Sequence, residues 1–189
     1  MAFLDEAPRP EMIIERADLV FARETLRSFM DTVALSRAIQ EIPDHPYAFT
    51  VAQRAAFDTA VISWCILFGS DHAEQQQIHW KNMFDVEEFR ERLLPGVGMN
   101  LDEWRAYRQG LVDYRNELAA HRDLNPKTRF HPNFHTALRA ADAYYAQLRE
   151  KVLAETGKEI GGRSLIEEFE DRLRMFREQM SAAIVGVPN

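Results

Sequence analysis

The sequence predicts an all-α fold, a single helical bundle of about five to six helices that spans residues 1–189. Apolar residues recur at steps of three and four in several long windows, which is the spacing of helices with one buried face. No window shows the sustained alternation of a strand, and no repeat of fixed period is present. The chain has 189 residues, of which 46% are hydrophobic and 28% charged, so it can form one sizeable core.

The N-terminal third of the chain predicts two helices joined by a proline-containing turn. Apolar positions follow a helical period over residues 10–40, with a proline near the start, and the length of this helix leaves room for a bend near Ser28. Pro43 and Pro46 then disfavour a helix, because proline lacks an N–H group and restricts the residue before it. A second helix is predicted over Phe49–Phe68, where many small residues favour a central position in the bundle.

The middle of the chain predicts a loop with one helical turn over residues 69–84 and then two helices. Asp85 can cap a helix over Val86–Leu94, with Glu88 three residues further on, and the motif PGVG breaks the chain after it. Asn100 can cap the next helix, which we predict to continue through Trp104–Asp123.

Two further helices are predicted in the C-terminal third. Pro132 opens the first, whose apolar residues keep a helical period until about Ala154. Three glycines between residues 157 and 162 interrupt it. Ser164 and Glu167 have the spacing of a capping box and open the last helix.

Composition and charge exclude several classes of protein. The longest apolar run is interrupted by Ser63 and is far shorter than the roughly 18 residues of a membrane span. The N-terminus lacks the basic and then apolar pattern of a secretory signal, and the single cysteine, Cys65, fits a reducing compartment as an inert core thiol. We therefore expect a cytoplasmic protein without a membrane contact. The net charge of −7 argues against a broad nucleic-acid surface but leaves room for a local basic groove.

The predicted helix over Trp104–Asp123 has one buried stripe, because its apolar residues recur at steps of three and four: Trp104, Tyr107, Leu111, Tyr114 and Leu118. It departs from a plain amphipathic pattern in one place. At about 100° per residue, Arg115 and His121 lie on either side of the apolar position Leu118. Three arginines seven residues apart form a basic ridge on the rim of the same face, and these are Arg108, Arg115 and Arg122. A cation and an imidazole beside an apolar stripe are costly unless they are paired or used, so this is the candidate site.

Other chemistries find little support in the sequence. His131 and His135 are four residues apart, but no third ligand stands at a suitable spacing, so we expect no metal. PGVG lacks the spacing of a phosphate-binding loop, no nucleophile motif of the form G-x-S-x-G is present, and Cys65 has no recognisable base partner. We therefore also expect no cofactor.

The motif YRNELAAHRD resembles the signature of the HEPN superfamily, in which an arginine and a polar residue are followed, a few residues later, by a histidine. Arg115, Asn116 and His121 match that pattern, and the stretch SWCILFGSDHAEQQQIHWKNMF is similar to the middle of abortive-infection and uncharacterised bacterial members. The resemblance covers the middle third of the chain. It implies a metal-independent endoribonuclease that acts as a homodimer, with two such motifs meeting across a two-fold axis, in phage defence or a toxin–antitoxin system.

The residue types fit that chemistry. Attack of an RNA 2′-OH on the adjacent phosphorus needs proton transfer, which His121 can supply, and cationic support for the phosphorane, which Arg115 can supply. Arg108 and Arg122 would bind substrate, and Tyr114 would support the site by stacking a base or by packing in the core. Asn116 would orient the substrate or Arg115, and Glu117 would pair with the imidazole of His121.

A second interpretation stays open at this point. Arg115 would then form a salt bridge with an acid on a neighbouring helix, and His121 would be a satisfied histidine at a helix C-terminus, where a cation suits the helix dipole. On this interpretation the chain is a non-catalytic helical module that binds a protein or RNA. Its partner would be an antitoxin or another protein, such as a nucleotidyltransferase-like protein whose regulated partner it is.

Overall fold

The computed structural model describes residues 16–69, 77–120, 127–128 and 130–185. Within these ranges every regular element is helical, which confirms the all-α prediction, with seven α-helices against the five to six expected. In chain order they are α1 (Ala17–Gln40), α2 (Tyr47–Phe68), α3 (Trp80–Met83), α4 (Val86–Val97), α5 (Leu101–Tyr114), the π-helical segment η2 (Arg115–Ala120), α6 (Phe134–Thr156) and α7 (Leu165–Val185).

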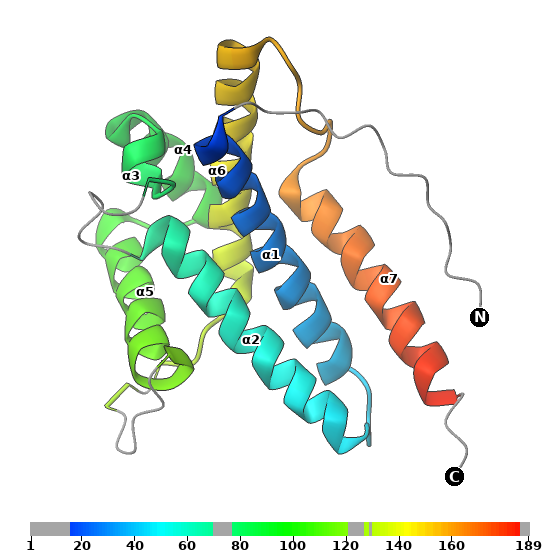
Figure 1. The fold of residues 1–189 in the computed structure, drawn as a ribbon. Coiled ribbons are helices and arrows are strands. Elements are labelled where there is room, and N and C mark those ends of the chain that lie inside the picture. The colour runs from blue at the N-terminus through cyan, green and yellow to red at the C-terminus, as the bar shows by residue number, and fades with distance from the viewer. Residues whose placement is uncertain (1–15, 70–76, 121–126, 129, 186–189) are drawn as a thin grey trace.

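The helices pack as a bundle around α1 and α2, which run side by side and are joined at one end by the turn through Pro43 and Pro46 (Figure 1). On the other side of α1 lies α7. Both α5 and η2 pack against α2, and α6 packs against α1, α4 and α7. Two ion pairs hold α7 against α1. Arg172 pairs with Asp31 at 3.1 Å, and Arg177 pairs at 2.6 Å with Glu41, which lies just past the end of α1.

The core of the bundle is rich in aromatic rings. Trp64 and Phe68 of α2 are fully buried and stack on one another with ring centroids 4.8 Å apart. Trp104 of α5 meets both rings edge to face, and Tyr144 of α6 meets Phe68 at 5.8 Å. Because offset and edge-to-face aromatic pairs stabilise beyond the area they bury, these contacts fix α5 and α6 against α2.

Most predicted caps are present, and one predicted break lies elsewhere. Asp85 accepts hydrogen bonds from the backbone N–H groups of Glu87 and Glu88, at 3.0 and 2.9 Å, and opens α4. The prediction that the motif PGVG breaks the chain after Leu94 is wrong, because α4 continues through Pro95 to Val97. Proline there removes one hydrogen bond in the final turn, and the helix ends at Gly98, whose φ of 69° is left-handed and favours glycine.

Among the described helices, α2 is the one that is long and apolar enough to cross a membrane by length and composition. In the bundle, 44% of its most apolar window is buried by the rest of the protein. Trp64, Cys65 and Leu67 lie in that buried part. The core of the bundle therefore accounts for part of the apolar character of α2.

Candidate functional site

The candidate site lies at the C-terminal end of α5, and the N-terminal end of this helix is firmly defined. The Asn100 side chain accepts hydrogen bonds from the backbone N–H groups of Asp102 and Glu103, each at 3.0 Å, while the Asn100 N–H donates to the Glu103 carboxylate at 2.8 Å. This reciprocal capping box confirms the predicted helix start. Trp104, Tyr107 and Leu111 are buried, as their spacing predicts.

The prediction of one α-helix over Trp104–Asp123 is wrong from Arg115 onward. The backbone changes there to a π-helical segment that continues to Ala120, and residues 121–123 lie outside the described residues. Tyr114 and Leu118, expected on the buried stripe, are only half-buried. Because the 100° step applies only to an α-helix, it no longer gives the angle between Arg115 and Leu118 on η2, and the expected place of His121 lies outside the described residues.

Arg115 stands at the junction of the two helix types. Its side chain is half-buried and donates from Nε and Nη2 to the Asn116 side-chain oxygen, at 3.0 and 2.8 Å. Within the described part of the chain, Arg115 forms no ion pair with a carboxylate. A guanidinium has five N–H donors, so the contact with Asn116 orients the group and leaves other donors for an anion.

His121 and Arg122 lie outside the described residues, but the chain on both sides of them is defined. Ala120 ends η2 immediately before His121. After the gap, the Glu117 carboxylate accepts hydrogen bonds from the backbone N–H groups of Lys127 and Thr128, at 2.6 and 2.8 Å. The sequence predicts Glu117 as the partner of the His121 imidazole. In the structure its carboxylate binds the segment that begins at Lys127, here called the returning chain, to η2.

Two further contacts hold the returning chain against α5. The ring of Phe130 lies so close to Gly110 that a Cβ added there would be 2.6 Å from Phe130 Cδ2. The Tyr107 hydroxyl donates to the Asn133 carbonyl oxygen at 2.6 Å. Glycine at position 110 therefore permits the chain that follows His121 to pack on the helix that precedes Arg115.

Tyr114 belongs to an aromatic cluster beside Arg115. Its ring meets Phe57 of α2 edge to face at 5.7 Å, and the exposed imidazole of His131 stacks on Phe57 at 5.5 Å. Burial raises the pKa of the Tyr114 hydroxyl, and the neighbouring Asp58 carboxylate adds to this effect. In the sequence His131 pairs by spacing only with His135, and no spacing signal places it near Tyr114, because the two come together through α2.

Cys65 is buried in α2, where its thiol lies 3.7 Å from the carbonyl oxygen of Leu111. Burial raises the pKa of this thiol to about 12, against the opposing field of Arg115 and Arg108. A thiol that stays protonated at neutral pH is a weak nucleophile, which agrees with a structural role. Among the described residues, no group of three histidine, cysteine or acidic side chains is placed to hold a metal ion.

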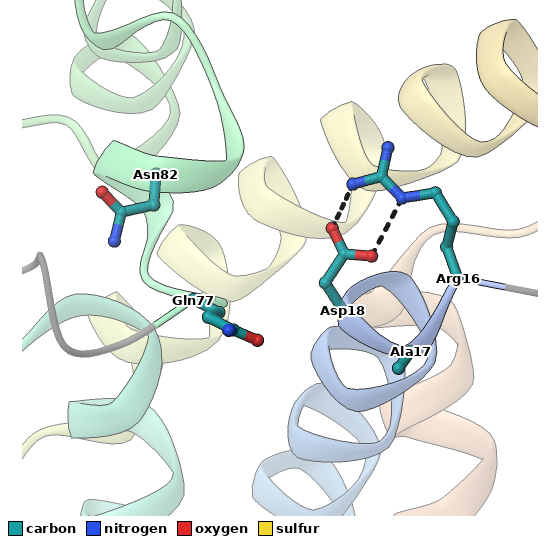
Figure 2. A pocket seen from close by; sticks show the side chains of 5 residues that line it. All are labelled: Arg16, Ala17, Asp18, Gln77 and Asn82. Atoms are coloured by element: carbon teal, nitrogen blue, oxygen red, sulfur yellow. Dashed lines mark hydrogen bonds and ion pairs between the residues drawn. The ribbon is translucent and has the colours of Figure 1, made fainter.

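One cavity of about 530 Å³ lies away from this region, between the start of α1 and residues 77–82. Figure 2 shows Arg16, Asp18, Gln77 and Asn82 around it, with Arg16 and Asp18 joined as an ion pair. Arg16 also pairs with Glu155 of α6. The cationic side chain that lines this cavity is thus already neutralised by two carboxylates.

A second cavity lies on the α3 and α4 side of α5, and Arg108 is among the residues that line it.

No protein family, curated protein or solved structure matches this chain.

Proposed function

We propose that this chain is a metal-independent endoribonuclease of the HEPN type, active as a cytoplasmic homodimer in phage defence or a toxin–antitoxin system. The observation that carries the proposal is the state of Arg115, which is oriented by Asn116, half-accessible, and unpaired with any carboxylate in the described part of the chain. His121 follows five residues after Asn116 in the chain. Burying part of a guanidinium without a carboxylate partner costs free energy, so an arginine held in this state fits a role in binding an anion.

The proposed reaction uses these two side chains for separate tasks. The 2′-oxygen of RNA loses its proton to an imidazole and forms a bond to the adjacent phosphorus, while the bond from phosphorus to the 5′-oxygen breaks. The leaving 5′-oxygen receives a proton from an imidazolium, and Arg115 holds the phosphate oxygens as their charge grows. The products are a 2′,3′-cyclic phosphate and a 5′-hydroxyl. Each chain contributes one candidate histidine, His121, which can carry out one of the two proton transfers. Two chains around a two-fold axis would supply both.

An exposed apolar stripe on α2 supports the dimer. Tyr47, Val51 and Ile62 expose 81%, 52% and 37% of their surface. Together with the exposed Ala55 they lie within an arc of about 80° on the helix, which they share with Asp58. Phe57 on the adjoining face contacts Tyr114, so the stripe borders the Arg115 region. Exposed apolar side chains that share one helix face favour an interaction site there, and an isologous contact across this face would bring two Arg115 regions together.

The same stripe favours the second candidate function, a non-catalytic module that docks a different protein such as an antitoxin. The two candidates differ in an observable way. A nuclease cleaves RNA without a partner, whereas the module does not, and a protein that remains a monomer at high concentration is inconsistent with a site shared by two copies.

The decisive experiment measures cleavage of bacterial total RNA in excess EDTA, with the product ends mapped. We expect 2′,3′-cyclic phosphate ends from the wild-type chain and loss of cleavage in Arg115→Ala and His121→Ala. Arg174→Ala on α7 and His135→Ala on α6 are matched controls, because both residues lie on other helices. Cleavage by His121→Ala at the wild-type rate would end the proposal.

A further inference from the structure

A cavity of about 470 Å³ opens between α3, α4 and α5. Among the described residues that line it, every charged side chain is a cation: Lys81 from α3, Arg90 from α4, and Arg105 and Arg108 from α5. Four cations around one cavity are unexpected in a chain whose net charge is −7. We call this cavity the basic groove.

Lys81, Arg90 and Arg105 are held in place without being fully neutralised. The Lys81 ammonium and the Arg90 guanidinium lie over the ring of Trp80, 5.8 and 5.9 Å from its centroid. Arg90 donates to Glu87 at 2.7 Å and Arg105 to Asp102 at 3.1 Å. Neither carboxylate lines the groove, and both are highly exposed, so these pairs are weak and leave guanidinium donors available.

Arg108 lines the groove, and Arg115 of the candidate site follows the last residue of the same helix, α5. Arg108 and Arg115 are seven residues apart, which places them about 20° from each other around the helix and about 10 Å apart along its axis. That length corresponds to roughly three stacked nucleotides of a strand. The buried rings of Trp80 and Trp104 line the groove beside the cations.

We infer that the basic groove binds phosphate groups of a nucleotide ligand, and that an RNA strand engaged at Arg115 lays its neighbouring phosphates there. Fixed guanidinium forks and an ammonium bind phosphate oxygens through charge-assisted hydrogen bonds, and a cavity of this size accepts a nucleotide. Their charge persists at all physiological pH values. This inference rests on the proposed function for the strand, whereas phosphate binding in the groove is independent of cleavage.

The test measures binding in the full chain carrying His121→Ala, a change that we expect to prevent cleavage of the RNA. EDTA is present to inhibit contaminating metal-dependent nucleases. The probe is a fluorescein-labelled 12-nucleotide RNA, followed by anisotropy over a salt series. Arg105→Glu removes a cation from the groove, and Arg174→Glu is its matched control, because Arg174 is as exposed and likewise pairs with an aspartate three residues earlier. Lys81→Gln gives a second groove variant on another element.

We expect Arg105→Glu and Lys81→Gln to weaken binding by roughly fivefold or more. Each should also lower the slope of log K against log salt by about 0.7 for every phosphate that the variant no longer binds. Arg174→Glu should bind as the parent chain does. Competition separates the two sources of phosphate: displacement by unlabelled RNA but not by AMP indicates a strand, and displacement by AMP at similar concentration indicates a mononucleotide.

Binding that is unchanged in both groove variants, or lowered equally by Arg174→Glu, would overturn the inference. The two proposals fail separately. An RNA that is bound through the groove but never cleaved by the wild-type chain refutes the nuclease, and an RNA that is cleaved by the wild-type chain but bound without the groove refutes the phosphate site.

Discussion

The contact of Glu117 with the returning chain gives the sharpest test of how the His121 segment is held. The Glu117 carboxylate accepts two backbone N–H groups, from Lys127 at 2.6 Å and Thr128 at 2.8 Å. A hydrogen bond to a charged group contributes about 1.5–3 kcal/mol. Glu117 is half-buried and Lys127 is exposed, so we take the lower end of that range for each bond.

Glu117→Ala should therefore favour local opening at residues 127 and 128 by about 3 kcal/mol, which is roughly 150-fold faster amide exchange there. Glu117→Gln keeps one acceptor oxygen without the charge, so its amide exchange at residues 127 and 128 should be faster than in the wild type and slower than in Glu117→Ala. Hydrogen exchange read by mass spectrometry on peptides that cover residues 127–133 measures the effect. Asp113→Ala is the control, because Asp113 lies on the same helix and accepts from the Gln109 side chain within that helix.

Unchanged exchange at residues 127 and 128 in Glu117→Ala would refute this assignment. Glu117 would then be free for its sequence-predicted role beside the His121 imidazole. That role predicts a different result: Glu117→Gln would shift the pH profile of RNA cleavage, and its amide exchange would be the same as that of the wild-type chain.

Three further predictions concern packing, ionisation and assembly. Gly110→Ala should destabilise the fold by about 1 kcal/mol in urea, because displacing Phe130 outweighs the helical gain, whereas Gly96→Ala, whose Cβ meets nothing within 4 Å, should be neutral or stabilising. The free energy of unfolding should fall between pH about 8.5 and 12, by up to about 1.4 kcal/mol per pH unit, because burial raises the pKa of the Cys65 thiol to about 12 and the thiol ionises in this range only in the unfolded chain. Cys65→Ala should remove this contribution to the pH dependence, measured by urea unfolding at each pH. Val51→Glu should halve the mass measured by light scattering, since a two-fold contact receives the charge twice, and an unchanged dimer would remove the α2 stripe from the interface.

Local signals in the sequence are sufficient to predict the helices and most of their ends. The period of Trp104, Tyr107 and Leu111 reports burial on one helix face, and the structure buries all three. The Asn100 cap depends on residues within three positions of it, and such short-range contacts are visible in a sequence. Ser164 and Glu167 form the predicted reciprocal contact for the same reason.

The details of the candidate site depend on long-range contacts, and these have no local signal. Spacing cannot show that α5 becomes π-helical at Arg115. Glu117 meets Lys127 ten residues away, and its spacing to His121 suggests a different partner. Phe130 reaches Gly110 because a chain passes back over α5, which only the fold determines.

The basic groove illustrates the same limit for charge. The net charge of −7 is a sum over the whole chain, whereas a ligand responds to charges within a screening length of about 8 Å at physiological ionic strength. Lys81, Arg90 and Arg105 come from three helices and meet in one cavity. Arg108 and Arg115 are roughly 10 Å apart along the helix axis. A phosphate bound between them is within reach of both cations, whereas the attraction or repulsion from acids farther away is largely screened. An acidic protein can therefore attract a strand along this face while its remaining surface repels nucleic acid, which would confine binding to a few phosphates and keep its salt dependence shallow.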